Sequence, residues 1–270
     1  MSYRILSRRR KRKAKEESAW LKRWVDSADA GVIVVVGDIG SGKTAFALRM
    51  LQLADRDRFI YVPPALRSRA VEVFDSVVPD AEIISRIDEI ESGVCVVDEA
   101  AINVAARRAM SQTNVDALQL AAIARHKQAL IFYLTQASRL IDVGLLLLAR
   151  DIVVKRLPWY FELFERRELV RLVAEKFGYQ YNRLKKLPPY LGYIVGRDFE
   201  QPRLFRFKLP DGWSDKVSRF MSAYRPCEAR SELAEKILEL REQGYSYRRI
   251  AEELGITLWQ VQKVLTYGLV

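Results

Sequence analysis

The chain has 270 residues, of which 50% are hydrophobic and 29% are charged, and it carries a formal net charge of +11. This size and composition suit a globular protein with one large domain, or with one large and one small domain, and a full hydrophobic core. We expect neither a membrane-spanning helix, which needs about 20 apolar residues, nor a signal peptide, because no apolar stretch follows the basic amino terminus.

Residues that could form disulfides or bind zinc are few. The two cysteines, Cys95 and Cys227, are too few for a disulfide framework, which favours a reducing, intracellular setting. With a single histidine, His126, in addition, a protein-bound zinc site is not expected. We therefore expect a cytoplasmic protein.

The basic excess is concentrated in an amino-terminal arm, which we assign to residues 1–28. Residues 1–25 hold ten Lys and Arg against two Glu, a net charge of +8, which leaves +3 for the other 245 residues. Such an arm suits sequence-independent contact with DNA phosphates, although a solvated tail explains the same residues equally well. The candidate DNA-binding residues of the arm are Arg8, Arg9, Arg10, Lys11, Arg12 and Lys13.

After a short helix at about 16–28, residues 31–157 alternate between expected strands and helices. The expected strands are 31–37, 58–62, 81–85, 93–101, 129–136 and 150–157, and the expected helices are 44–54, 65–77, 103–127 and 141–149. Such alternation predicts an α/β fold with a mostly parallel sheet that is covered on both faces.

The following part of the chain is rich in aromatic residues. We expect 159–173 and 190–210 to form strands or hairpins that extend the edge of the sheet, with a short helix at 214–224. Pro226 marks a change to a purely helical pattern. We therefore predict a large α/β domain over 29–226 and a small all-α domain over 227–270.

A phosphate-binding loop is the strongest motif of the chain. Residues 37–44 read GDIGSGKT and match G-x-x-x-x-G-K-[ST] at every fixed position. We expect Gly37, Gly40 and Gly42 to adopt positive φ angles that turn backbone N–H groups towards phosphates. Lys43 would reach the β- and γ-phosphate oxygens of ATP, and Thr44 would offer its hydroxyl to Mg²⁺. The predicted nucleotide-binding residues of the loop are Gly37, Asp38, Ile39, Gly40, Ser41, Gly42, Lys43 and Thr44.

Two carboxylates end another buried strand. The segment VCVVDEA puts Asp98 and Glu99 at the carboxyl end of this strand, where open α/β sheets bind their ligands. We expect Asp98 to hold Mg²⁺ through water and Glu99 to act as the base that polarises the attacking water. A solvated pair that merely closes the strand is the alternative.

A third strand carries a sensor motif. The segment ALIFYLTQ ends in Thr135 and Gln136, and a neutral amide at a strand end can sense the presence of a γ-phosphate. With this motif, residues 31–157 resemble the HerA/FtsK superfamily of DNA-pumping ATPases, which includes viral genome-packaging ATPases and Zot-like phage assembly proteins. Arg125 before the strand, and Arg139 and Asp142 after it, match the pattern of this superfamily.

The resemblance implies a RecA-like P-loop core that works as a ring, usually a hexamer, with ATP and Mg²⁺ as ligands. Each site in such a ring is closed by an arginine of the next subunit. Arg125 is the best match, and its spacing leaves open whether it acts in its own subunit or in the neighbouring one. The other candidates are Arg107, Arg108, Arg139 and Arg150.

The tail of the chain resembles helix-turn-helix DNA-binding domains. Residues 231–269 predict three helices, with apolar stripes at Leu233, Ile237 and Leu240, at Ile250, Ala251 and Leu254, and at Val261, Val264 and Leu265. Gly255 would supply the tight turn, and Thr257 would cap the last helix. A protein-contact module is the alternative. The candidate DNA-binding residues are Arg248, Arg249, Leu258, Trp259, Gln260, Gln262 and Lys263.

Together the motifs predict an ATP-hydrolysing translocase of DNA, with duplex DNA as the expected cargo. By analogy with the superfamily, it would be a viral genome-packaging motor that docks on a capsid or another protein in the host cytoplasm or the virion. An ATP-gated DNA-binding regulator, or a replication or partition factor, is the main alternative. A small-molecule kinase is disfavoured, because it would need neither Glu99 nor a DNA-binding tail.

Overall fold

The structure is a computed structural model of the chain. It describes residues 16–98, 113–135, 143–158, 161, 167–178, 181–197, 199–214, 216, 217, 220, 236–254, 258, 261, 262 and 265. The chain divides into two compact units, Met1–Met221 and Ser222–Val270.

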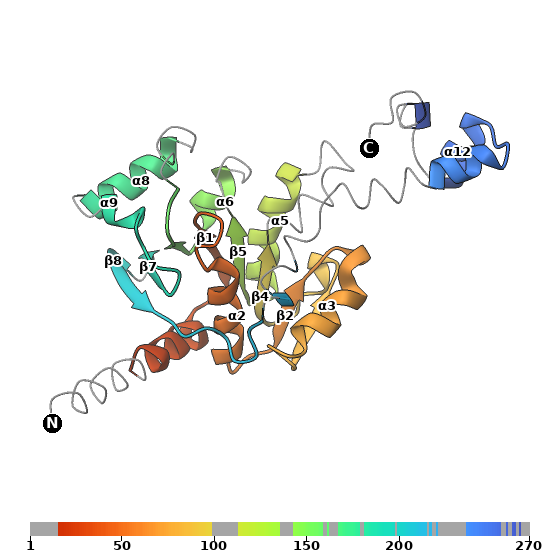
Figure 1. The fold of residues 1–270 in the computed structure, drawn as a ribbon. Helices are drawn as coiled ribbons and strands as arrows, with labels where there is room; N and C mark the ends of the chain where they lie inside the picture. Colours follow the sequence, from red (N-terminus) through yellow and green to blue (C-terminus); the bar gives the residue numbers. More distant parts are fainter. Residues whose placement is uncertain are drawn as a thin grey trace. The chain divides into compact units, whose positions relative to one another are not determined.

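An eight-stranded sheet forms the centre of the first unit (Figure 1). Its strands are β1 (Gly31–Val36), β2 (Arg58–Tyr61), β3 (Ala81–Ile84), β4 (Gly93–Asp98), β5 (Ala129–Thr135), β6 (Asp151–Val154), β7 (Leu191–Gly196) and β8 (Phe199–Arg206). They lie in the order β3-β2-β4-β5-β1-β6-β7-β8, and every pair from β3 to β6 is parallel. The predicted RecA-like α/β class is therefore confirmed.

The central strands are buried on both faces because their sequences are almost continuously apolar. Every residue of β1 and of β5 is buried, and both strands consist largely of β-branched and aromatic residues. The side chains alternate between the two faces of the sheet. On β5, for example, Ile131 and Tyr133 belong to one cluster of the core, whereas the Phe132 ring lies against Phe46 and Trp24 on the opposite face.

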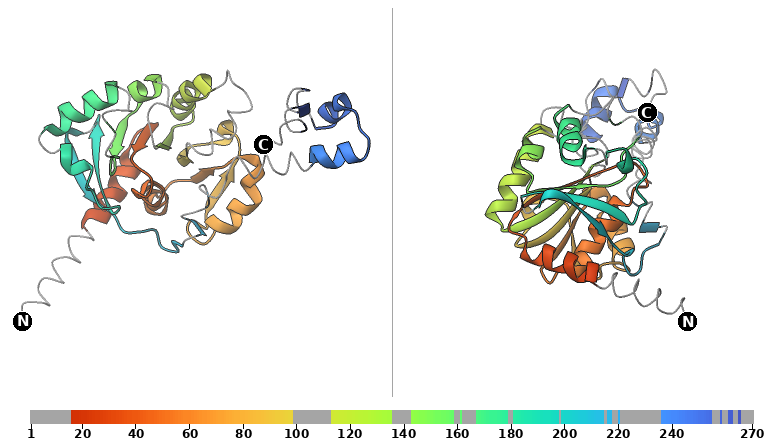
Figure 2. Two further views of the ribbon diagram at one scale, coloured as in Figure 1. Left: turned by 45° about the horizontal axis from the view of Figure 1, so that its top comes forward. Right: turned by 90° about the vertical axis from the view of Figure 1, so that its left-hand side faces the viewer.

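Helices cover both faces, as the alternation of strands and helices predicts (Figure 2). The helical residues 16–27, α2 (Lys43–Leu53) and α3 (Arg67–Phe74) lie on one face. On the other face, α5 (Thr113–His126) and α6 (Val143–Leu148) cover the centre of the sheet, and α8 (Arg167–Phe177) and α9 (Tyr181–Leu184) pack over β6 and β7. Two short 3₁₀ turns, Pro64–Leu66 and Ile87–Glu89, precede α3 and β4.

The expectation of strands over 159–173 is wrong for the residues of this range that belong to α8. Leu169, Val173 and Phe177 recur at intervals of four residues, and all three are buried against β6 and β7. This is the helical period, and it governs the segment because it gives α8 one continuous apolar face. The aromatic residues upstream of it suggested a strand instead.

The prediction of a hairpin that extends the sheet is confirmed. β7 and β8 pair with each other, and β7 pairs with β6, all antiparallel. β8 forms one edge of the sheet and contains Pro202, which has no N–H group to donate. The chain then returns along the sheet, where Asp211 accepts a hydrogen bond from Arg49 of α2 at 2.9 Å and the Phe220 ring packs on Phe74 of α3.

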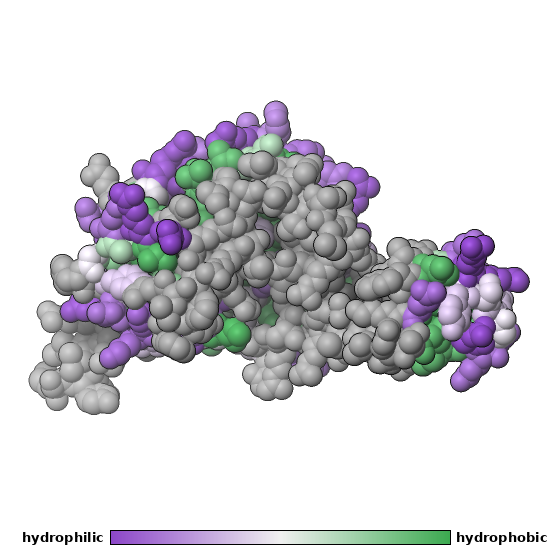
Figure 3. All heavy atoms as spheres, turned by 90° about the horizontal axis from the view of Figure 1, so that it is seen from above, coloured by the Kyte–Doolittle hydropathy of each residue, from purple (hydrophilic) through white to green (hydrophobic). Residues whose placement is uncertain are grey.

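The surface of the described residues is predominantly hydrophilic in the view of Figure 3, where hydrophobic side chains form small, separate patches. Among the residues that the structure describes, no helix has both the length and the apolar character needed to cross a membrane.

The second unit is helical where it is described. Residues 236–242 and α12 (Tyr247–Leu254) are helices, as are residues 258, 261, 262 and 265. Ile237, Ile250, Ala251 and Val261 form its core, and Leu240, Leu254 and Leu265 pack against them. The predicted Leu233, Val264, Gly255 and Thr257 lie outside the described residues.

Candidate functional site

The loop Gly37–Thr44 connects the carboxyl end of β1 to the start of α2. Gly42 is the residue that precedes the helix, and no acidic side chain lies in the first turn of α2, so nothing in that turn competes for the N–H groups at the helix end. The Lys43 ammonium donates to the carbonyl oxygens of Gly37 and Asp38, both at 2.9 Å. The lysine therefore spans the concave side of the loop.

One buried hydroxyl of the loop indicates that the loop binds an anionic ligand. Ser41 is fully buried, and its Oγ has no hydrogen-bond partner among the described residues. A buried hydroxyl without a partner costs free energy, and a phosphate oxygen is an acceptor that would remove this cost. The residues of the loop thus fit a bound phosphate.

The glycines of the loop serve two different purposes. Gly40 and Gly42 have φ angles of +68° and +83°, as predicted. Gly37 does not have a positive φ, which corrects the prediction for this residue. A Cβ atom at Gly37 would lie 2.7 Å from the Cβ of Lys155, so glycine is needed there for space.

Two segments support the loop: the residues that follow β6 and the turn before β7. The Asp38 amide donates to the Arg156 carbonyl at 2.7 Å, and the Arg156 guanidinium donates to the Ile39 carbonyl at 3.0 Å. A Cβ atom at Gly42 would meet the Pro189 carbonyl oxygen at 2.6 Å. The loop is therefore held between these two segments.

Lys155 connects these two supports and was not identified from the sequence. Its side chain is fully buried, and its ammonium donates to the carbonyls of Pro189 and Leu191 at 2.8 and 2.6 Å. Three aromatic rings surround it, at 4.4 Å (Phe207), 5.6 Å (Phe205) and 5.9 Å (Phe46) from ammonium to ring centroid. Burial, and then the charge of Lys43, lower the pKa of Lys155 to about 7. The only feature of the sequence that could have indicated a buried lysine here is its position at the end of the apolar run DIVV.

The two residues expected to hold Mg²⁺ lie together. Thr44 and Asp98 line the same small cavity of about 10 Å³, and its other lining residues are aliphatic or aromatic, so the cavity shows only that these two side chains are close neighbours. The register of the sheet explains this placement, because Asp98 is opposite Leu134 and Val36 is opposite Thr135. The oxygen atoms of a hydroxyl and a carboxylate are ligands that suit Mg²⁺.

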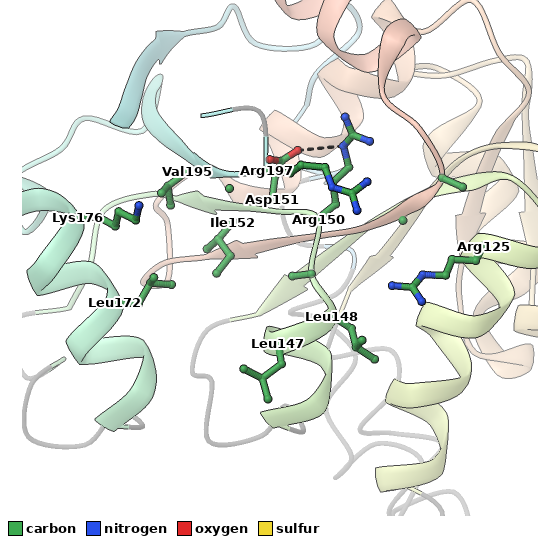
Figure 4. A pocket seen from close by; sticks show the side chains of 14 residues that line it. Arg125, Leu147, Leu148, Arg150, Asp151, Ile152, Leu172, Lys176, Val195 and Arg197 are labelled. Atoms are coloured by element: carbon green, nitrogen blue, oxygen red, sulfur yellow. Dashed lines mark hydrogen bonds and ion pairs between the residues drawn. The ribbon is translucent and has the colours of Figure 1, made fainter. Parts of the chain in front are cut away.

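The other predicted catalytic residues are divided between two places. Glu99 and Gln136 lie outside the described residues, directly after Asp98 and Thr135. Arg125 is exposed in the last turn of α5 and lines a cavity together with Gly31, at the amino end of β1 (Figure 4). Because β1 has six residues, this end of the sheet is roughly 20 Å from the phosphate loop. Arg125 therefore cannot reach a phosphate in the loop of its own chain.

Among the other candidate arginines, Arg107, Arg108 and Arg139 lie outside the described residues. Arg150 forms ion pairs with Asp151 at 3.3 Å and with Asp29 at 3.4 Å, and its side chain is only 7% exposed. Arg150 is therefore part of the packing at the amino end of the sheet. The single histidine, His126, is exposed beside Arg125.

The basic residues of the arm, 8–13, lie outside the described residues, but the helix that follows them is firmly attached to the core. Leu21, Trp24 and Val25 are buried, and the Arg203 guanidinium lies 3.9 Å from the centroid of the Trp20 ring.

In the second unit, Arg248, Arg249, Leu258 and Gln262 are exposed, whereas Trp259, Gln260 and Lys263 lie outside the described residues. Leu258 and Gln262 are four residues apart and so lie on one side of a helix, while Val261 faces the core. The Arg249 guanidinium lies 4.6 Å from the centroid of the Tyr245 ring.

No protein-family model and no curated protein matches the chain. Among solved structures, it is similar to the DNA-packaging ATPase of Sulfolobus turreted icosahedral virus, with 13% identity and a TM-score of 0.40 over 66% of this chain and 98% of that one. It is also similar to the genome-packaging NTPase of Sulfolobus turreted icosahedral virus 2 in complex with sulfate, with 14% identity and a TM-score of 0.45 over 68% and 100%. The conjugation coupling protein TcpA of pCW3 matches with 11% identity and a TM-score of 0.42 over 74% of this chain and 65% of that one. At these identities no side chain of this protein acquires a role from the similarity alone.

Proposed function

We propose that the protein is an ATP-hydrolysing translocase of DNA. The observation that carries this proposal is the position of β5 between β1 and β4. Because all three strands are parallel and in register, the phosphate loop, Thr135 and Asp98 lie at one end of the sheet. The residues that directly follow Thr135 and Asp98 are Gln136 and Glu99, the sensor and the base that a hydrolase requires.

In this proposal the loop binds the phosphates of ATP. The Lys43 ammonium exchanges the carbonyls of Gly37 and Asp38 for β- and γ-phosphate oxygens, and the Ser41 hydroxyl donates to a phosphate oxygen. The N–H groups at the start of α2 add favourable partial charge. These contacts fix the γ-phosphate on the side of the loop that faces β5 and β4.

Thr44 and Asp98 would hold Mg²⁺, directly or through water, and the ion would neutralise charge on the β- and γ-phosphates. Glu99 would accept a proton from the attacking water. Gln136 would hydrogen-bond the γ-phosphate or that water, and so it would transmit the loss of the γ-phosphate to the chain that follows β5.

The arm and the second unit would grip duplex DNA, through phosphates at residues 8–13 and through Arg248, Arg249 and the exposed face of the last helix. Since Arg125 is roughly 20 Å from the loop of its own chain, it would complete the site of a neighbouring copy, an arrangement that a ring of head-to-tail copies provides. We further propose a hexamer that packages a viral genome and docks on a capsid protein.

Steady-state ATP hydrolysis tests the proposal in the presence of DNA duplexes of increasing length and unrelated sequence. A translocase is expected to turn over faster with any duplex, and more so with longer ones. Sequence-specific footprinting with turnover that DNA barely changes would instead support an ATP-gated regulator.

Two variants make this test specific to the site. Lys43→Ala is expected to lose nucleotide binding or turnover, whereas Glu99→Gln should bind ATP but hydrolyse it about 100-fold more slowly or worse, because only water activation is removed. Hydrolysis by Glu99→Gln at the unmodified rate would show that Glu99 is not the base.

A further inference from the structure

A second cavity lies at the amino end of the parallel strands, opposite the phosphate loop (Figure 4). Its volume is about 400 Å³, within the range of ligand-binding pockets. Five segments far apart in the chain build it: the start of β1, the end of α5, the end of α6 with the first residues of β6, α8, and the end of β7 with the residue that follows it. The phosphate loop and the catalytic residues proposed to act within one chain do not line this cavity, so the proposed ATP site gives it no role.

The charge of this cavity is positive. Arg125, Lys176 and Arg197 line it from three different segments, and each is an exposed residue. The fourth cation, Arg150, forms ion pairs with Asp29 and Asp151, and Asp151 is the only carboxylate among the described residues that line the cavity. The carboxyl ends of α5 and α8 contribute about half a negative charge each, which is too little to balance Arg125 and Arg197.

The rest of the lining is apolar and continues out of the cavity. Ile152, Leu172 and Val195 line it, and Leu148 of α6 is 38% exposed at its side. Leu147, which also lines the cavity, is 78% exposed, a large value for an apolar side chain. An occupant therefore meets apolar surface both inside the cavity and on the adjoining end of α6 (Figure 4).

We propose that this cavity binds a peptide segment of a partner protein in which a carboxylate side chain lies next to an apolar side chain. The carboxylate would sit between Arg197 and Arg125, and the apolar side chain would fill the space against Ile152, Leu172 and Val195. Duplex DNA offers phosphates but no apolar group that could enter a cavity, and a small anion would leave Leu147 and Leu148 uncovered. Within one chain the cavity lies at the opposite end of the sheet from the phosphate loop, and Arg125 is the residue that both proposals use. The test is therefore built on Arg197 and Leu148, which the ATP proposal does not use, so either proposal can fail without the other.

Fluorescence anisotropy on the full chain tests this site with a labelled peptide in which Glu-Leu pairs are separated by Gly-Ser spacers. Two matched peptides replace Glu by Gln or Leu by Ser. Arg197→Glu and Leu148→Asp are the site variants, and Arg69→Glu and Val71→Asp, at exposed positions of α3, are the matched controls.

We expect the Glu-Leu peptide to bind, the Gln and Ser peptides to bind more weakly, and Arg197→Glu to lower the affinity by about tenfold or more. Arg69→Glu and Val71→Asp should leave it unchanged. Arg197→Gln, which nearly keeps the size of the side chain, should weaken binding to a smaller extent. Unchanged circular dichroism and thermal unfolding would show that each variant is folded.

Three results would overturn the proposal. The first is an equal loss of affinity in Arg69→Glu, which would mean non-specific attraction to a basic protein. The second is equal binding of the Gln peptide, or no binding of any peptide. The third is displacement of the peptide by duplex DNA together with loss of DNA affinity in Arg197→Glu, which would assign the cavity to DNA.

Discussion

Replacement of the buried lysine beside the phosphate loop should change how stability depends on pH. Lys155 has a pKa of about 7 in the folded chain, lowered from 10.5 by burial and by the charge of Lys43. The unfolded chain keeps its proton up to a pH of about 10. Between these two values the unfolded state binds more protons than the folded state, so the free energy of unfolding rises with pH. Lys155→Met removes this contribution, since methionine fills similar space and does not titrate.

The size of the effect follows from the two pKa values. Each pH unit in which the unfolded chain holds one proton more than the folded chain changes the free energy of unfolding by about 1.4 kcal/mol. Because Lys155 is half protonated near pH 7, we expect the unmodified protein to gain about 2 kcal/mol relative to Lys155→Met between pH 7 and pH 9. Below pH 6 the difference between the two proteins should be constant.

Urea unfolding followed by tryptophan fluorescence, at several pH values and fixed ionic strength, measures this difference. Lys208→Met, at an exposed position, controls for the loss of a lysine as such. A difference between the unmodified protein and Lys155→Met that stays flat from pH 7 to 9 would refute the reasoning. It would mean that the carbonyls of Pro189 and Leu191 and the three rings compensate the burial of the charge.

Two further predictions concern the phosphate loop and the arm. Gly42→Ala should weaken ATP binding and cost about 1–2 kcal/mol of stability, because the φ of +83° is strained for alanine and its Cβ would meet the Pro189 carbonyl. Equilibrium binding of labelled ATP and thermal unfolding would measure the two effects. Unaltered affinity would show that the turn at 189 does not hold the loop. Deletion of residues 1–15 should weaken DNA binding and flatten its dependence on salt, as measured by duplex titrations at several salt concentrations, whereas an unchanged slope would mean that the arm is a solvated tail.

The order of elements in the first unit could be predicted because its strands and helices have clear and different periods. β1, β4 and β5 are uninterrupted apolar runs bounded by polar residues, and α2 follows the loop without any helix-breaking residue. α8 could not be separated from the aromatic segment that precedes it, because its helical period begins only at about Arg167. The order of the strands depends on contacts between distant segments, which local patterns do not contain.

The candidate site was predictable where chemistry requires a fixed spacing. The phosphate-loop pattern identified Lys43 and Thr44, and a carboxylate at a strand end identified Asp98, which lines the same cavity as Thr44. The supports of the loop were not predictable. Arg156 supports the loop through its carbonyl and its guanidinium, and the Pro189 carbonyl lies beside Gly42. All three involve a backbone carbonyl of the loop or of its support, and such contacts leave no characteristic spacing in the sequence.

The two borders of the sheet limit how copies of the chain can associate. β8 carries Pro202 in its middle and exposed arginines at 203 and 206, and β3 has only four residues and an exposed Glu82. The missing N–H donor of Pro202, the charged side chains and the short length of β3 all disfavour hydrogen bonding of these edge strands to a strand of another chain. In the proposed ring, copies of the chain are therefore expected to meet through helices and loops, which would let them slide against one another without breaking β-sheet hydrogen bonds.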